Sequence, residues 1–138
     1  MYRKDYIQRQ FEEFGKVLAQ LLSLRKLEDW SQFEKEMEEA LRRFSDTEIN
    51  GLLAMDHDAF IQKIVLPTTL TPEQKKMMAR LLFEKLESRL AQVDERDCAD
   101  LAEKCLLLYE HLQRNLTTNE FDLDIYYKLE FLKNLKLS

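Results

Sequence analysis

The chain has 138 residues, of which 45% are hydrophobic, only two glycines and two prolines, and a formal net charge of −5. This length suits one domain with a substantial core, and so few turn-forming residues argue against a sheet, which needs a turn between successive strands. No basic cluster exceeds two adjacent residues, so no face could neutralise a run of phosphates, and we expect no nucleic-acid partner.

The chain also lacks the signals of membrane insertion and export. No stretch approaches the ~18 uncharged apolar residues that suggest a membrane span, and the charged N-terminal segment has no signal-peptide core. Cys98 and Cys105 would lie about 10.5 Å apart along one helix, which is too far for a disulfide. We therefore predict a cytoplasmic protein with no membrane partner.

Two amphipathic segments at the start of the chain predict a helical hairpin over residues 4–44. Apolar residues recur at steps of three and four in residues 4–26 and again in residues 30–44, which is the helical period. The short connection between the segments predicts an antiparallel pair. Gly15, inside the first helix, either permits a close approach of another helix or is tolerated at a cost of up to ~1 kcal/mol relative to alanine.

Residues 45–66 form a middle section with two short predicted helices. Ser45 and Glu48 have the spacing of a capping box, which would open the first helix. Asp56 or Asp58 would cap the second helix. Pro67 would end it, because the residue before proline avoids helical backbone angles.

A second helical hairpin is predicted over residues 72–116. Thr71 and Gln74 have capping-box spacing, with proline between them at the first helical position, which predicts a helix over residues 72–93. Residues 94–116 carry their apolar side chains on one helical face. We expect this helix to be the element around which the rest of the domain packs.

Residues 117–120 form a third capping-box pattern and predict a terminal helix over residues 119–136. This helix is apolar on two sides. Its more continuous stripe is assigned to the core and consists of Phe121, Ile125, Leu129, Leu132 and Leu135. Leu123, Tyr127 and Phe131 are then expected to face outward as a partner-binding surface, because aromatic side chains dominate interface hot spots. The alternative is a helix inserted between two others of its own domain.

No pattern predicts a catalytic, cofactor-binding or metal site. His57 and His111 lack the glutamate three residues earlier that di-iron helical bundles use. Cys98 lies near a predicted helix start, but on the apolar face and beside Asp97 and Asp100, which oppose a thiolate. No glycine-rich loop is present to hold a phosphate. We therefore expect no enzyme, no cofactor and no metal.

One resemblance to known proteins is visible in these segments. The stretch Asp29-Trp30-Ser31-Gln32-Phe33-Glu34, leading to Glu39-Ala40-Leu41, resembles the second helix of a tetratricopeptide unit, and the region from 101 to 135 resembles a final unit. The layout as a whole is similar to small all-helical bacterial proteins with tetratricopeptide-like hairpins. The Gly-x-x-Tyr of the first helices is absent, and the helices are too long for units of about 34 residues. The resemblance implies a helical scaffold and brings no catalytic residues.

The sequence thus predicts a single all-α domain over residues 1–138. Six or seven helices would form antiparallel hairpins, stacked in a tetratricopeptide-like arrangement or as an irregular bundle. The expected function is a non-enzymatic scaffold for protein–protein interaction or self-association, with another protein or a second copy as partner. The alternative is a small-ligand-binding protein or enzyme with a pocket between the hairpins, where either Tyr109, Glu110 and His111 or the tyrosine pair Tyr126-Tyr127 would supply polar groups.

Overall fold

The computed structural model describes residues 2–116 and 122–135, and within them every regular element is helical. Seven α-helices, one π-helical turn and one 3-10 turn follow one another along the chain. Their bounds are α1 Tyr2–Lys26, α2 Trp30–Ser45, α3 Ile49–Ala54, α4 His57–Phe60, η1 Ile61–Val65, α5 Pro72–Leu90, η2 Glu95–Cys98, α6 Ala99–Arg114 and α7 Leu123–Lys133. The prediction of an all-α fold with six or seven helices is confirmed.

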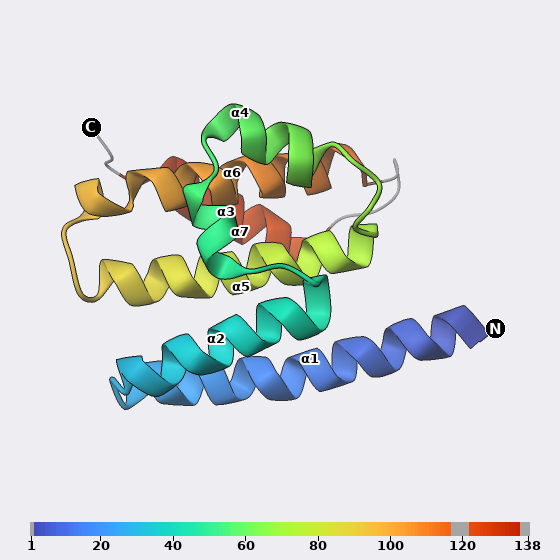
Figure 1. The fold of residues 1–138 in the computed structure, drawn as a ribbon, viewed down its shortest axis with the longest axis horizontal. Helices are drawn as coiled ribbons and strands as arrows, with labels where there is room; N and C mark the ends of the chain where they lie inside the picture. Colours follow the sequence, from blue (N-terminus) through green and yellow to red (C-terminus); the bar gives the residue numbers. More distant parts are fainter. Residues whose placement is uncertain (1, 117–121, 136–138) are drawn as a thin grey trace.

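Helix α5 lies at the centre of this arrangement (Figure 1). The α1–α2 hairpin packs along one side of it and α6 along another, while α7 lies behind α5 and α6 in the view. Helices α1 and α7 run in the direction of α5, and α2 and α6 run the opposite way. The short helices α3 and α4 and the π-helical turn η1 lie over α6.

Residues 94–116 are packed on several sides as expected, since α6 contacts α5, α7, α4 and the π-helical turn, but α5 is the more deeply buried helix. Eleven of the nineteen residues of α5 are buried, against seven of the sixteen in α6. The buried set of α5 includes Lys75, Glu84 and Lys85, which pair with other groups inside the domain. A helix that other helices enclose on several sides also buries some of its polar residues. This burial depends on how the other helices pack, so the sequence of the helix alone does not predict it.

The predicted helix caps are correct at two positions and wrong at a third. The Thr71 hydroxyl accepts a hydrogen bond from Gln74 N (3.1 Å), and the Gln74 side chain accepts one from Thr71 N (2.9 Å), which is a complete capping box. Asp56 caps α4. Ser45, however, lies in the last turn of α2 and donates its hydroxyl to the Leu41 carbonyl. Asp46 then ends α2 in the left-handed region at φ 50°, so the predicted capping box is not formed.

Some helix ends also differ from the predicted ones. Helix α5 ends at Leu90 and not at residue 93, and a 3-10 turn capped by Asp94 precedes α6. Helix α7 begins at Leu123 because the Asp122 side chain accepts a hydrogen bond from Ile125 N. The capping box predicted at residues 117–120 lies outside the described residues.

Gly15 on α1 offers a direct test of helix propensity. It is exposed, and a Cβ placed there would meet no atom within 4 Å, so no close helix approach requires glycine. Gly15→Ala should raise the free energy of unfolding by about 0.5–1 kcal/mol, measured by urea denaturation. Ala19→Gly, one turn later and also exposed, should lower it by a similar amount. A destabilising Gly15→Ala would show that this glycine has a structural role.

Candidate functional site

Helix α7 has one buried side and one exposed side. Ile125, Leu129 and Leu132 are 2%, 2% and 4% exposed, so this part of the predicted core stripe faces inward. Leu135 is partly buried against the core, and Phe121 lies outside the described residues. On the other side Leu123 is 57% exposed and Tyr127 62%. Phe131, at 36%, stands between the two environments. We call Leu123, Tyr127 and Phe131 the outer α7 patch; its binding of a partner stays a prediction.

The three residues of the patch differ in their contacts with the domain. The Phe131 ring meets the buried Phe83 ring of α5 edge to face, with centroids 5.3 Å apart, so part of its surface belongs to the core. Tyr127 makes an edge-to-face contact with its neighbour Tyr126 at 5.5 Å. Leu123 and Tyr127 are therefore the patch positions at which a substitution acts mainly on the surface.

Ion pairs fix α7 to α5 and so hold the patch in place. The Asp122 carboxylate accepts from Lys76 Nζ at 2.6 Å while it caps the helix through Ile125 N. Burial opposes the charged form of Asp122, but the hydrogen bonds from Lys76 and Ile125 N outweigh it, and the pKa of this carboxyl is lowered. Asp124 pairs with Arg80 at 3.5 Å. Neither ion pair was predicted, because the partners are more than forty residues apart.

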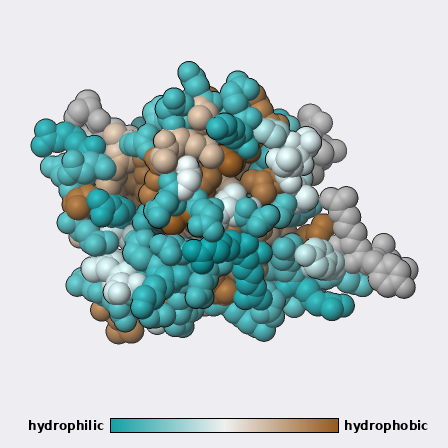
Figure 2. All heavy atoms as spheres, viewed as in Figure 1, coloured by the Kyte–Doolittle hydropathy of each residue, from teal (hydrophilic) through white to brown (hydrophobic). Residues whose placement is uncertain are grey.

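The view in Figure 2 shows a different face of the molecule from the outer α7 patch. Hydrophilic residues cover most of it, especially over α1 and α2, and hydrophobic residues gather where α3 and α6 lie. Helix α7 is on the far side of α5 and α6 in this orientation. Leu27 and Leu66 are also exposed, but each is a single leucine outside α7. Isolated exposed leucines are common on protein surfaces, whereas the patch follows one helix for two turns.

The alternative ligand site, with Tyr109, Glu110 and His111, is not assembled as predicted. Tyr109 is 1% exposed, its ring packs on Phe83 at 6.2 Å, and its hydroxyl has no hydrogen-bond partner in the described structure. Burial raises the pKa of Tyr109 well above its usual value. Glu110 pairs with Arg114 at 3.7 Å. His111 lines a cavity.

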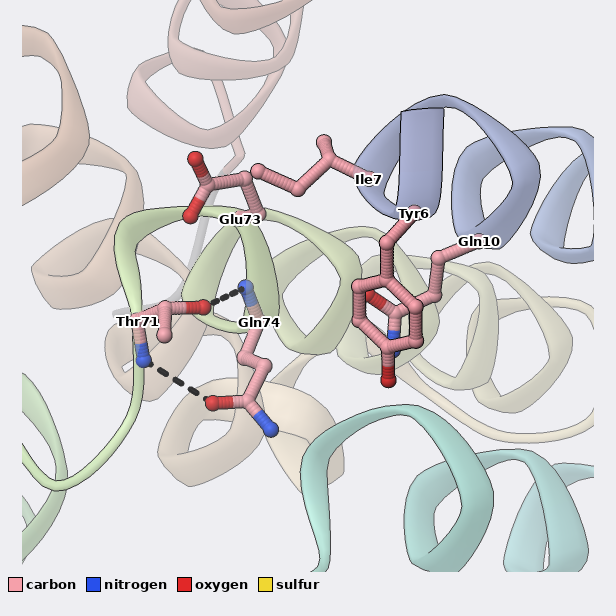
Figure 3. Close-up of a pocket in the computed structure, with 6 residues that line it drawn as sticks. All are labelled: Tyr6, Ile7, Gln10, Thr71, Glu73 and Gln74. Atoms are coloured by element: carbon pink, nitrogen blue, oxygen red, sulfur yellow. Dashed lines mark hydrogen bonds between the residues drawn. The ribbon is translucent and has the colours of Figure 1, made fainter. Parts of the chain in front are cut away.

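Three of the cavities adjoin the start of α5, and two of them share Thr71. One, of about 430 Å³, lies between α1 and the α5 capping box. In Figure 3 Tyr6 and Gln10 extend from α1 on one side, and Thr71 and Gln74 lie on the other with their polar atoms bonded to each other. The other, of about 460 Å³, shares Thr71 and is lined by Lys75 and His111 among others. The second cavity is lined by a basic residue, Lys75, whereas the first has the acidic Glu73 and no lysine or arginine in its lining.

The cysteines and histidines are placed as structural groups. Cys98 and Cys105 are free and buried, and burial raises the pKa of both thiols. His57 lies 3.1 Å from an oxygen of Asp100. Over residues 2–116 and 122–135 there is no group of three or more metal-ligating side chains. In the same ranges no helix is both long and apolar enough to cross a membrane.

In comparisons with known proteins, no family model, curated protein or solved structure matches the chain. The tetratricopeptide-like resemblance therefore stays a prediction.

Proposed function

We propose that the protein is a non-enzymatic helical scaffold that self-associates through the outer α7 patch. The supporting observation is that α7 is apolar on two sides, with Ile125 buried at 2% and Tyr127 exposed at 62%. A helix needs one apolar side to dock on its own domain, and α7 has that side in place. A second apolar stripe along the same helix gains free energy only when another surface covers it.

A second copy of the chain is the partner that fits this surface best. Helix α7 packs its inner side on α6, which runs antiparallel to it, and its outer side is left uncovered by the described residues at Leu123 and Tyr127. Two α7 helices that run antiparallel about a two-fold axis would cover each other. Tyr127, at the middle of the patch, would then lie close to the axis.

The charges on α7 suit a contact with a second copy. At about 100° per residue, one flank of the patch carries Asp124 and Lys128, and the other carries Glu130 and Lys133. A two-fold axis brings the same flank of each helix together, so a flank with one acid and one base is complementary to itself. Helix α7 has no net charge, although the whole chain carries −5, so it is a place where two copies meet without strong repulsion.

Tyr127→Glu tests this proposal. It places a carboxylate at the centre of the contact in both copies, and we expect the dimer dissociation constant to rise at least ~100-fold. Light scattering over a concentration series should show a dimer for the wild type and a monomer for the variant. The monomer's thermal unfolding should change little, because Tyr127 is 62% exposed.

Tyr6→Glu is the matched control. Tyr6 is 65% exposed on α1, so the same substitution is made away from α7. This variant should dimerise as the wild type does. A wild-type protein that stays monomeric, or a Tyr127→Glu variant that still dimerises, would contradict self-association through α7.

A further inference from the structure

Three lysines are buried in the domain, and one of them lacks a carboxylate. Lys85 Nζ pairs with Glu34 at 2.6 Å, and Lys104 Nζ pairs with Asp100 at 2.7 Å. Lys75, 5% exposed, donates to the Val65 carbonyl at 2.8 Å, which is its only hydrogen-bond acceptor among the described residues. An ammonium has three N–H donors, so two of them are unused. A buried charge without a counter-charge is unfavourable unless something else completes it.

The cavity of about 460 Å³ lies next to this lysine. The segment between η1 and α5, the first turn of α5 and the end of α6 form its walls. Leu66, Leu70 and Leu112 make a large part of the lining apolar, His111 and Asn115 add polar groups, and no acidic residue lines it. Its size is in the range of pockets for small organic ligands.

The electrostatic setting of the cavity favours a negative charge. It adjoins the N-terminal end of α5, where the helix dipole is positive. His111 is partly buried, and burial together with the positive charges of Lys75 and Arg114 lowers its pKa. Lys75 supplies the positive charge of the lining, and no acidic residue of the lining offsets it.

We propose that this cavity binds a small organic carboxylate, whose oxygens accept hydrogen bonds from Lys75 and whose apolar part lies against Leu66, Leu70 and Leu112. The ligand supplies Lys75 with the counter-charge that Glu34 and Asp100 supply to the other buried lysines. A phosphate fits less well, because tight phosphate binding uses several donors or a guanidinium, and leucines line much of the cavity. The site shares no residue with the outer α7 patch, so ligand binding here and self-association through α7 can be tested independently.

The ring signals of the two histidines in an NMR titration provide the test, with octanoate as the probe. Bound octanoate should raise the pKa of His111, because a nearby negative charge favours the imidazolium. The ring signals of His57, which lies beside Asp100, should not respond to octanoate. Octanamide, which has the same chain without the charge, should bind at least ~10-fold more weakly. Equal binding of the amide would overturn the proposal, and so would inorganic phosphate binding as tightly as octanoate.

Two variants tie the binding to this cavity. Lys75→Met removes the ammonium without leaving a carboxylate unpaired, and should lower octanoate affinity at least ~10-fold. Lys85→Met, at a second buried lysine, should leave the affinity unchanged. Thr68→Trp is a second test for the case in which Lys75→Met does not fold. Thr68 is exposed at the cavity wall, so a bulky ring there should block octanoate binding. Octanoate binding that survives both Lys75→Met and Thr68→Trp would place the ligand elsewhere and refute the assignment.

Discussion

Ile125→Glu should detach α7 from the domain. Ile125 is 2% exposed in the stripe that α7 packs inward, and Lys76, which lines a cavity with it, is already paired with Asp122. Burial of an unpaired carboxylate, added to the loss of the apolar contact, should lower the free energy of unfolding by roughly 3–5 kcal/mol. Urea denaturation followed by circular dichroism measures the loss. Hydrogen exchange should show that the amides of α7 lose their protection first.

Tyr127→Glu is the control on the same helix. It introduces the same residue two positions later, at a site that is 62% exposed, so the monomer should lose less than about 1 kcal/mol. The difference between the two losses in free energy of unfolding measures how much more the inner side of α7 is buried than its outer side. Equal losses would mean that the exposed side is also buried in the folded protein and that the outer α7 patch is not a free surface.

The two sides of α7 could be predicted from the sequence because local spacing carries the information. Apolar residues at steps of three and four fall on one side of a helix wherever it packs, so Ile125, Leu129 and Leu132 were correctly assigned inward and Leu123 and Tyr127 outward. The contact of Phe131 with Phe83 was not predictable in this way. This contact joins residues 48 positions apart in the sequence, so it depends on how α7 crosses α5.

The spacing of apolar residues in the sequence could not predict that α5 is central or that its charged side chains are buried. Glu84 meets Arg25 across 59 positions, and Lys85 meets Glu34 across 51. In the sequence such residues indicate a solvated face, since charged side chains are rarely buried unless paired. The sequence does contain one indication that Lys75 is buried. It precedes Met78 and Leu82 at helical spacing, so it lies on the buried side of α5.

Glu84→Gln should be strongly destabilising. The Glu84 carboxylate is 2% exposed and accepts hydrogen bonds from Arg25 at 2.8 Å and from Arg80 at 2.9 Å. It thus joins α1 to α5, and Arg80 extends the contact to Asp124 of α7. Glutamine keeps the shape but removes the charge, which leaves two guanidinium groups facing each other across a neutral amide. We expect a loss of roughly 3–5 kcal/mol in the free energy of unfolding.

Glu87→Gln is the matched control for Glu84→Gln. Glu87 lies three residues later on α5, its side chain is 31% exposed, and its oxygen is 4.0 Å from Arg25, so this change should cost less than about 1 kcal/mol. Adding Arg25→Met to Glu84→Gln should recover part of the lost stability, because it removes one of the two opposed charges. Denaturant unfolding of the single and double variants gives the coupling. If Glu84→Gln costs no more than Glu87→Gln, the buried carboxylate does not hold α1 and α7 to the central helix.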